Sequence, residues 1–148
     1  PILVGSSMGG WGAMLFSLKN PKKTQKLIGI APAPDFTTEL LWRELSEKNK
    51  KLIKSNKIVR KKISDNFYYD YSPKLFINSK NCLIKNMNKT FKGETIFFHG
   101  ASDHTVPYNY NNKFLKRKNF PQLLYITIKN ADHSMSDNYS LKTISKFI

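Results

Sequence analysis

Apolar positions along the chain form short continuous runs that alternate with stretches of helical spacing. Residues 1–4 form the first run and residues 27–31 the second, and between them the spacing predicts a helix from Gly9 to Leu18. Asn20-Pro21 is a helix stop. A strand, a helix and a strand in this order predict a right-handed parallel crossover unit, whose sheet is buried on both faces.

The pattern changes between residues 35 and 88. Three elements are predicted there: a helix over 37–51, a hairpin of residues 57–63 and 67–71, and a helix that begins at Ser72-Pro73 and reaches Met87. A stretch of roughly 55 residues is too long for a plain loop between two strands. We therefore expect residues 35–88 to form a cap that is inserted into the core.

The pattern of buried strands returns after this segment. It predicts two more strands, over 93–100 and 123–129, and two helices, over 107–118 and 141–148. Residues 1–34 and 89–148 together predict an α/β core with a mostly parallel sheet, and the length of 148 residues indicates one domain. No apolar run approaches the ~20 residues that a membrane span needs.

The formal net charge of +15 changes this picture little. A basic balance can mark a nucleic-acid or membrane partner. Among the 25 basic side chains, however, only Arg43, Arg60 and Arg117 are arginines, the residue that phosphate and guanine recognition favours. The sequence also has no zinc-finger spacing and no RNP-like aromatic motif. We expect no nucleic-acid partner, and we interpret the lysine cluster at 48–62 as a solvated face.

Cys82 is the only cysteine, so the sequence predicts neither a disulfide framework nor a cysteine-based metal site. We expect no metal and no cofactor. No signal-peptide pattern precedes the first strand, and cytoplasm is the default expectation for the compartment. The sequence does not indicate an oligomeric state.

Gly5-Ser6-Ser7-Met8-Gly9 follows the first strand directly and matches G-x-S-x-G, the nucleophile elbow, at a strand-to-helix junction. In such a turn the central residue has a strained backbone, and glycines two before and two after it remove Cβ atoms that would clash. The turn presents the Ser7 hydroxyl at the carboxyl edge of the sheet and directs the Met8 amide at an oxyanion formed there. Ser6 is off the centre of the pattern, so Ser7 is the predicted nucleophile.

A serine nucleophile needs a base that takes its proton and a third group that orients the base. Asp103 follows the strand that ends near Gly100, and His133 follows the strand that ends near Lys129. Both side chains are therefore expected at the same sheet edge as Ser7. The order Ser, Asp, His along the chain is the one expected of α/β-hydrolases.

Other acids and histidines lie close to these positions. Asp132 and Asp137 are rival acids, but Asp132 adjoins His133 and would struggle to reach its imidazole Nδ1. We interpret His99 and His104 as polar surface. The acid of the triad is therefore assigned to the aspartate of the earlier loop.

The chain resembles the α/β-hydrolase-fold serine hydrolases through Gly5–Gly10, His99–Pro107 and Asp132–His133. The closer resemblance is to the palmitoyl-protein thioesterase and acyl-glucuronide esterase group known from mitochondria, with bacterial relatives, through Gly5–Trp11, Tyr71-Ser72 and Asp132–Met135. In that fold the elbow follows the fifth strand of an eight-stranded sheet. The resemblance implies that this chain is the C-terminal part of the domain, without the first strands, two helices and the His-Gly loop that supplies the second oxyanion amide.

The resemblance implies a carboxylic ester or thioester hydrolase that works through an acyl-enzyme on a small-molecule or acylated-protein substrate. Ser7 would attack the acyl carbonyl, His133 would act as base and then as acid, Asp103 would orient His133, and the Met8 N–H would hold the oxyanion. Aromatic residues of the cap would line an acyl pocket, although they fit an ordinary core equally well. They are Trp42, Phe67, Tyr68 and Tyr69.

Two alternatives stay open at this point. A serine peptidase of the prolyl-oligopeptidase type shares a G-x-S-x-G-G elbow and an acid loop of this form. The other alternative is an inactive fragment whose basic cap binds an acidic partner. For residues 1–148 expressed alone we expect poor solubility and no ester hydrolysis, because the strand at residues 2–4 would be an unpaired edge.

Overall fold

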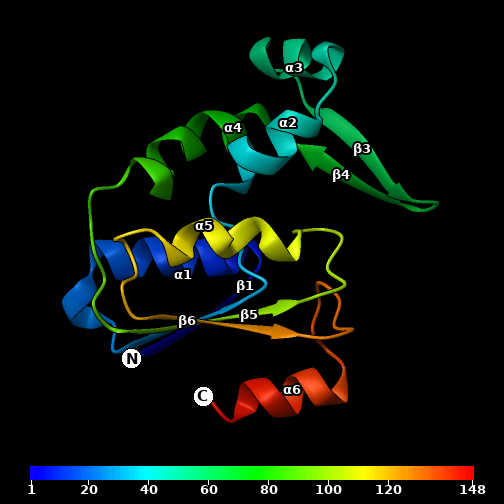
Figure 1. The fold of residues 1–148 in the computed structure, drawn as a ribbon. Helices are drawn as coiled ribbons and strands as arrows, with labels where there is room; N and C mark the ends of the chain where they lie inside the picture. Colours follow the sequence, from blue (N-terminus) through cyan, green and yellow to red (C-terminus); the bar gives the residue numbers. More distant parts are fainter. The chain divides into compact units, whose positions relative to one another are not determined.

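A computed structural model of the chain describes the backbone of residues 1–148 and the side chains of all of them except Ile63, Ser64 and Phe67. The chain divides into two compact units. One consists of Pro1–Pro34 and Asn86–Ile148, and the other is Asp35–Lys85, which runs from cyan to green in Figure 1. The second unit covers most of the segment 35–88, whose role as a cap stays a prediction.

Four parallel strands form the sheet of the first unit, in the order β1-β2-β5-β6. They are β1 (Ile2–Ser6), β2 (Lys26–Ile30), β5 (Glu94–Gly100) and β6 (Leu123–Ile128). Val4 lies opposite Ile28, which lies opposite Ile96, so the strands are in one continuous register. The four carboxyl ends therefore meet at one edge of the sheet, as the sequence predicted.

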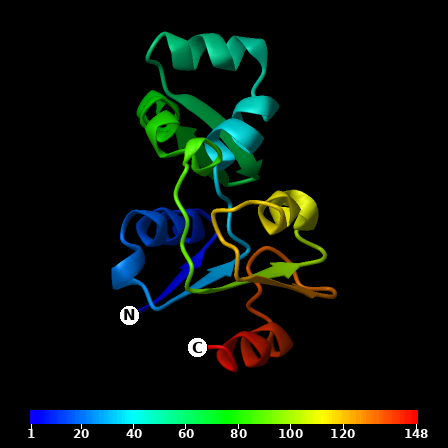
Figure 2. The same cartoon turned by 60° about the vertical axis from the view of Figure 1, so that its left-hand side comes forward.

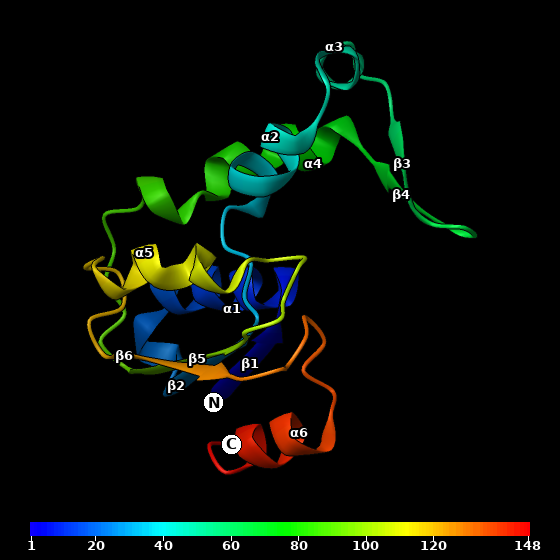
Figure 3. The same ribbon diagram turned by 45° about the vertical axis from the view of Figure 1, so that its right-hand side comes forward.

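Helices cover both faces of this sheet, as Figures 1, 2 and 3 show. Helix α1 (Met8–Lys19) and the short α5 (Asn112–Leu115) lie over one face, and α6 (Asn138–Ser145) lies over the other. Alternate side chains of a strand point to opposite faces. The central strands β2 and β5 are buried on both faces along most of their length, so they appear in the sequence as continuous apolar runs. The outer strands β1 and β6 are partly exposed, so the predicted burial of residues 1–4 is wrong.

The core on the α6 face is built from β2, β5, β6 and the helix itself. Ile144 of α6 packs with Ile28, Ile96 and Phe98, and all four are 4% exposed or less. On the α1 face the helix buries apolar side chains at helical spacing. They are Trp11, Met14 and Leu18.

Two helix predictions in the first unit are wrong in their bounds. The segment predicted as a helix over 107–118 is a 3₁₀ turn, Tyr108–Asn111, followed by the single turn of α5. The closing helix begins at Asn138 rather than at 141, because the Asp137 carboxylate accepts hydrogen bonds from the amides of Tyr139 and Ser140.

The second unit contains short helices and a two-stranded hairpin. Its elements are a π-helical turn (Thr37–Leu41), α2 (Trp42–Glu44), α3 (Glu47–Lys54), β3 (Val59–Ser64), β4 (Phe67–Tyr71), α4 (Pro73–Ser79) and two 3₁₀ turns (Lys80–Cys82 and Ile84–Asn86). The antiparallel hairpin is confirmed, with Arg60 opposite Asp70. A small core of Leu45, Ile53 and Phe76 lies inside the unit.

Both long helices predicted for this segment are interrupted. The predicted helix over 37–51 breaks at Leu45, whose backbone is extended, and Ser46 starts α3 by accepting a hydrogen bond from the Asn49 amide at 3.2 Å. The second helix begins at Ser72-Pro73 as predicted but ends at Ser79 instead of Met87. A polar cap residue inside a helical pattern therefore ended one helix and started the next.

Asp35 joins the two ends of the second unit. Its carboxylate accepts hydrogen bonds from the amides of Ile84 at 2.7 Å and Lys85 at 2.9 Å, and the residue is 1% exposed. Burial of a carboxylate is tolerated where it accepts such bonds. The first and last residues of the unit are thus held together.

None of the helices in the described part of the chain has both the length and the apolar character that a bilayer crossing needs.

Candidate active site

Ser7 lies in the turn between β1 and α1 with φ 49° and ψ −119°. Its amide donates a hydrogen bond to the Ile30 carbonyl at 2.9 Å, and its carbonyl accepts from the amides of Trp11 at 3.2 Å and Ala33 at 3.0 Å. A positive φ is costly for a residue with a side chain and persists only where the surroundings hold it. These three bonds hold it here, so the strained turn expected of an elbow is present.

Of the two glycines that flank this turn, only one lies where a side chain would clash with its surroundings. A Cβ at Gly5 would lie 2.4 Å from the carbonyl oxygen of Gly9, whereas a Cβ at Gly9 would meet nothing within 4 Å. The prediction that both glycines remove clashing Cβ atoms is therefore wrong for Gly9. Gly10 is also required for steric reasons, because a Cβ there would lie 2.8 Å from the Cβ of Pro32.

Gly5→Ala is expected to lower the free energy of unfolding by about 1–3 kcal/mol, because backbone atoms must move to admit the methyl group. Gly12→Ala is the matched control: a Cβ there meets nothing within 4 Å, and alanine favours the helix by up to about 1 kcal/mol. Denaturant unfolding of both variants of the full-length protein measures the difference. Equal stability of the two variants would contradict the steric argument.

The structure brings Ser7, His133 and Asp103 together at the carboxyl edge of the sheet. The His133 Nε2 lies 3.0 Å from the Ser7 Oγ, and its Nδ1 lies 2.8 Å from the Asp103 Oδ2. An ionised carboxylate can only accept, so the proton is on Nδ1 and Nε2 is free to accept from the hydroxyl. This is the geometry that a nucleophile, a base and an orienting acid require.

The Asp103 carboxylate is held by the backbone of its own loop. Its Oδ1 accepts hydrogen bonds from the amides of Thr105 at 2.9 Å and Val106 at 2.8 Å, and its side chain is fully buried. The imidazole of His133, by contrast, is 26% exposed. The acid is therefore held in place by its own loop, while the base is partly accessible to solvent.

The sequence interpretation missed that His99 lies next to the triad acid. His99 was expected at the polar surface, but it is fully buried, with its Nε2 2.8 Å from the Val106 carbonyl and 3.2 Å from the Asp103 Oδ2. The surface interpretation is wrong for His99, whereas His104 is exposed. The missed signal was its place inside a run that is buried on both faces, from Thr95 to Gly100.

Burial lowers the pKa of His99 below its usual value of 6.5, against the opposing effects of the Val106 carbonyl and Asp103. The unfolded chain therefore takes up a proton at this ring at a higher pH than the folded protein does. The free energy of unfolding is expected to be fully supported above about pH 6.5 and to fall as the pH drops towards the folded pKa.

Denaturant unfolding of the full-length protein between about pH 7.5 and 5.5 measures this slope. His99→Phe is expected to flatten it, because phenylalanine has no imidazole that can be protonated. His104→Gln, at the exposed neighbouring histidine, is expected to leave it unchanged. An equal slope in the parent and in His99→Phe would contradict the assignment.

Asp132 and Asp137, the two other candidate acids, form hydrogen bonds within their own turns. Asp132 is exposed, and its Oδ1 accepts hydrogen bonds from the amides of Ser134 at 2.9 Å and Met135 at 3.0 Å. The hydroxyl of Ser134 donates to the same oxygen and is the main reason why the pKa of Asp132 is lowered. Asp137 caps α6.

Met8 is the first residue of α1, and amides in the first turn of a helix have no intrahelical acceptor. Its side chain is 58% exposed. The amide is therefore available for a ligand, and its role at the oxyanion stays a prediction.

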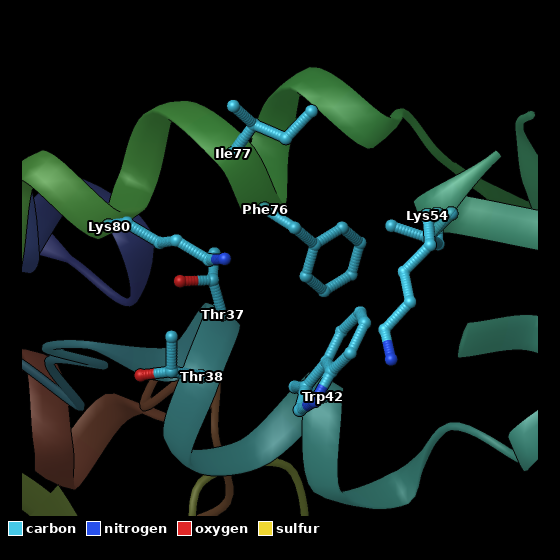
Figure 4. Close-up of a pocket in the computed structure, with 8 residues that line it drawn as sticks. Thr37, Thr38, Trp42, Lys54, Phe76, Ile77 and Lys80 are labelled. Atoms are coloured by element: carbon cyan, nitrogen blue, oxygen red, sulfur yellow. The ribbon is translucent and has the colours of Figure 1, made fainter. Parts of the chain in front are cut away.

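Trp42 lines a pocket of about 320 Å³ within the second unit. Figure 4 shows its indole facing Phe76, with ring centroids 5.6 Å apart, and Lys54 extending towards the indole. Tyr68 and Tyr69 are about half exposed on the hairpin, and the side chain of Phe67 lies outside the described residues. Of the predicted acyl-pocket residues whose side chains are described, Trp42 thus lines this pocket.

No family model matches the chain. Among curated proteins, the mitochondrial palmitoyl-protein thioesterase ABHD10 of Rattus norvegicus is 30% identical over 139 residues, which make up 92% of this chain and 46% of that protein. The chain thus spans about half the length of the curated relatives it matches.

Two solved structures show the fold. A putative hydrolase from Agrobacterium vitis S4 matches with a TM-score of 0.87 at 23% identity, over 99% of this chain and 59% of that one. The alpha/beta hydrolase domain-containing protein 10 from mouse matches with a TM-score of 0.80 at 24% identity, over 99% of this chain and 60% of that one. The chain therefore has the α/β-hydrolase fold, as predicted, and is similar to the palmitoyl-protein thioesterases named ABHD10.

Proposed function

We propose that the protein is a serine hydrolase that cleaves carboxylic ester or thioester bonds through an acyl-enzyme. The observation that carries the proposal is the unbroken line of hydrogen bonds from Asp103 through His133 to the hydroxyl of Ser7. The name of the rat relative, a palmitoyl-protein thioesterase, supports the same class of bond. The proposed substrate is a small molecule or an acylated protein.

In the first half-reaction the Ser7 Oγ attacks the acyl carbonyl while the His133 Nε2 takes its proton. The buried carboxylate of Asp103 stabilises the imidazolium that forms. Negative charge develops on the former carbonyl oxygen, where the Met8 amide and the N-terminus of α1 stabilise it. When the tetrahedral intermediate collapses, the C–O or C–S bond breaks and His133 returns the proton to the leaving alkoxide or thiolate.

In the second half-reaction water takes the place of the leaving group. His133 removes a proton from the water, which attacks the acyl carbonyl of the ester on Ser7. Collapse of the second intermediate releases the carboxylic acid and returns the proton to Ser7. No step needs a metal or a cofactor.

The direct test is labelling of the full-length protein with a fluorophosphonate, followed by peptide mass spectrometry. We expect one adduct, on Ser7, and none in Ser7→Ala. A panel of acyl esters, acyl thioesters and prolyl peptides then separates the reaction classes. Faster cleavage of the peptides would favour the peptidase alternative, and absence of an adduct on Ser7 in the folded protein would refute the proposal.

We also propose that the pocket of Trp42 and Phe76 receives the acyl chain, because these two rings and two isoleucines form an apolar part of its wall, beside two threonines and two lysines. Trp42→Ala is expected to raise KM for long-chain acyl esters by roughly 10- to 150-fold, since the lost aromatic surface accounts for a binding free energy of about 1.5–3 kcal/mol. The KM for an acetyl ester should stay unchanged. Equal effects on both substrates would contradict an acyl-binding role.

The expected cytoplasmic location stays a prediction. The name of the rat relative places that protein in mitochondria.

A further inference from the structure

We propose that His99 and Asn111 are positioning residues that fix the Asp103 carboxylate and connect its loop to the turn that carries Ser7. The inference rests on the proposed serine hydrolase function. It concerns two buried side chains of the first unit that take no part in the reaction as written above.

The hydrogen bonds of His99 define one tautomer of a neutral ring. Its Nε2 faces two groups that can only accept, the Val106 carbonyl at 2.8 Å and the Asp103 Oδ2 at 3.2 Å. The proton is therefore on Nε2. The Nδ1 then carries a lone pair, and it faces the Nδ2 of Asn111 at 3.4 Å.

Asn111 forms its hydrogen bonds through the NH₂ group of its side chain. Its Nδ2 donates to the Pro32 carbonyl at 2.7 Å and reaches the His99 ring, which fixes the orientation of the amide. Its Oδ1 is buried without a hydrogen-bond partner among the described atoms. A buried acceptor left unpaired is unfavourable, and such groups are rare in folded proteins. An amide at this position therefore indicates that its two N–H groups are needed.

A second series of contacts links the turn of Ser7 to Asp103 without passing through His133. Asn111 binds the carbonyl of Pro32, and the next amide, that of Ala33, donates to the Ser7 carbonyl at 3.0 Å. From Asn111 the path continues through His99 to the carboxylate of Asp103. The hydrogen bonds of the triad, from Asp103 through His133 to Ser7, complete this circuit of contacts. The nucleophile and the acid are thus held relative to each other by two routes, one of them fully buried.

The Asp103 carboxylate links His99 to His133, the base of the proposed reaction. Its Oδ2 accepts a hydrogen bond from the Nδ1–H of His133 at 2.8 Å and lies 3.2 Å from the Nε2 of His99, so both histidines face one oxygen. Tyr125 packs against His99 with ring centroids 6.1 Å apart, and the charges of Asp103 and His133 also act on this ring. Without the N–H of His99, the oxygen keeps its full negative charge for the imidazolium of His133. That imidazolium becomes more stable, and the carboxylate loses a lateral constraint.

The experiment compares His99→Phe, which keeps a ring but no donor, with His99→Gln, whose amide can donate again. In the full-length protein we expect His99→Phe to lower kcat on the order of 10- to 100-fold, with KM within about twofold, because the acid and base lose alignment. The acid limb of the kcat/KM profile should move to higher pH. His99→Gln should recover most of kcat, and His104→Phe, at the exposed histidine, should behave as the parent.

Two further measurements keep the test decisive. Asn111→Leu removes both amide donors without touching Asp103 and should shift kcat in the same direction. The downfield proton resonance of the His133 Nδ1–H should be sharp in the parent and broadened or moved in His99→Phe, whether or not the protein turns over the chosen substrate. A parent that carries this resonance but takes no fluorophosphonate would count against the proposed function alone.

The positioning role is overturned by any one of three results. The first is a kcat and pH profile of His99→Phe equal to those of the parent. The second is an equal loss in His99→Phe and His99→Gln, with both variants folded. The third is an unchanged His133 resonance in both His99→Phe and Asn111→Leu.

Discussion

Ser7→Ala in the full-length protein is expected to lower kcat on the order of a million-fold while leaving the fold intact. The hydroxyl lies 3.0 Å from the His133 Nε2 and is the group placed to attack. The strained backbone of the turn is held by three main-chain hydrogen bonds, which alanine keeps. The measurement is turnover of an acyl ester and an acyl thioester, together with thermal unfolding of the variant.

His133→Ala is expected to lower kcat nearly as much as Ser7→Ala does. The kcat of the double variant should be little lower than that of either single variant. Members of a triad act as a unit, so their effects do not add. Two observations would contradict this mechanism: retention of most of the esterase rate by Ser7→Ala, or losses that multiply in the double variant.

Asp103→Asn is the second large effect, a fall in kcat of about 10⁴-fold with the fold retained. The Oδ1 of Asp103 accepts from the amides of Thr105 and Val106, so the oxygen of an asparagine must remain on that side. Its NH₂ group then faces the Nδ1 of His133 and forces the proton onto Nε2. The imidazole in that tautomer cannot take the proton of the serine.

Asp132→Asn is the matched control for this variant, because it makes the same chemical change at an exposed turn next to His133. It should leave kcat within about twofold of the parent, as expected for a surface substitution. Turnover and thermal unfolding of the two variants are measured together. Equal rates for Asp103→Asn and the parent would show that Asp103 is not the orienting acid.

Residues whose roles depend on neighbours in the chain were predictable. Gly5 to Met8 carry their geometry in a local pattern, in which an apolar strand runs into a helix through one strained residue. Asp103 lies in the loop after β5, and His133 lies in the loop after β6. Because parallel strands end at one edge of a sheet, their meeting with Ser7 follows from topology alone.

Helix bounds in the second unit were less predictable. Leu45 lies at a helical position in the sequence, but its backbone is extended in the structure, and Ser46 starts a new helix there. Helical spacing continues across such a break, since both short helices turn apolar side chains to the same small core. The cap bond of Ser46 is the signal that could have placed the break.

His99 shows most clearly what local pattern does not reveal. In the sequence it is a polar residue at the end of a strand, and histidines are found both exposed and buried. In the structure its three partners come from the loop after β5 and from the turn before α5. No spacing along the chain relates Asn111 to His99 or to Pro32, because side-chain bonds across 12 and 79 positions form only when the strands are already packed.

The sequence by itself determined the α/β class of this protein, the turn of Ser7 and the order of the three triad residues. These depend on hydrophobic periodicity and on the backbone needs of one short turn. The tertiary structure alone decided that His99 is buried next to Asp103, that Asn111 joins His99 to the Pro32 carbonyl, and that Gly9 has room for a side chain. Those outcomes depend on distances between segments far apart in the chain, which are set by packing of the whole sheet and its helices.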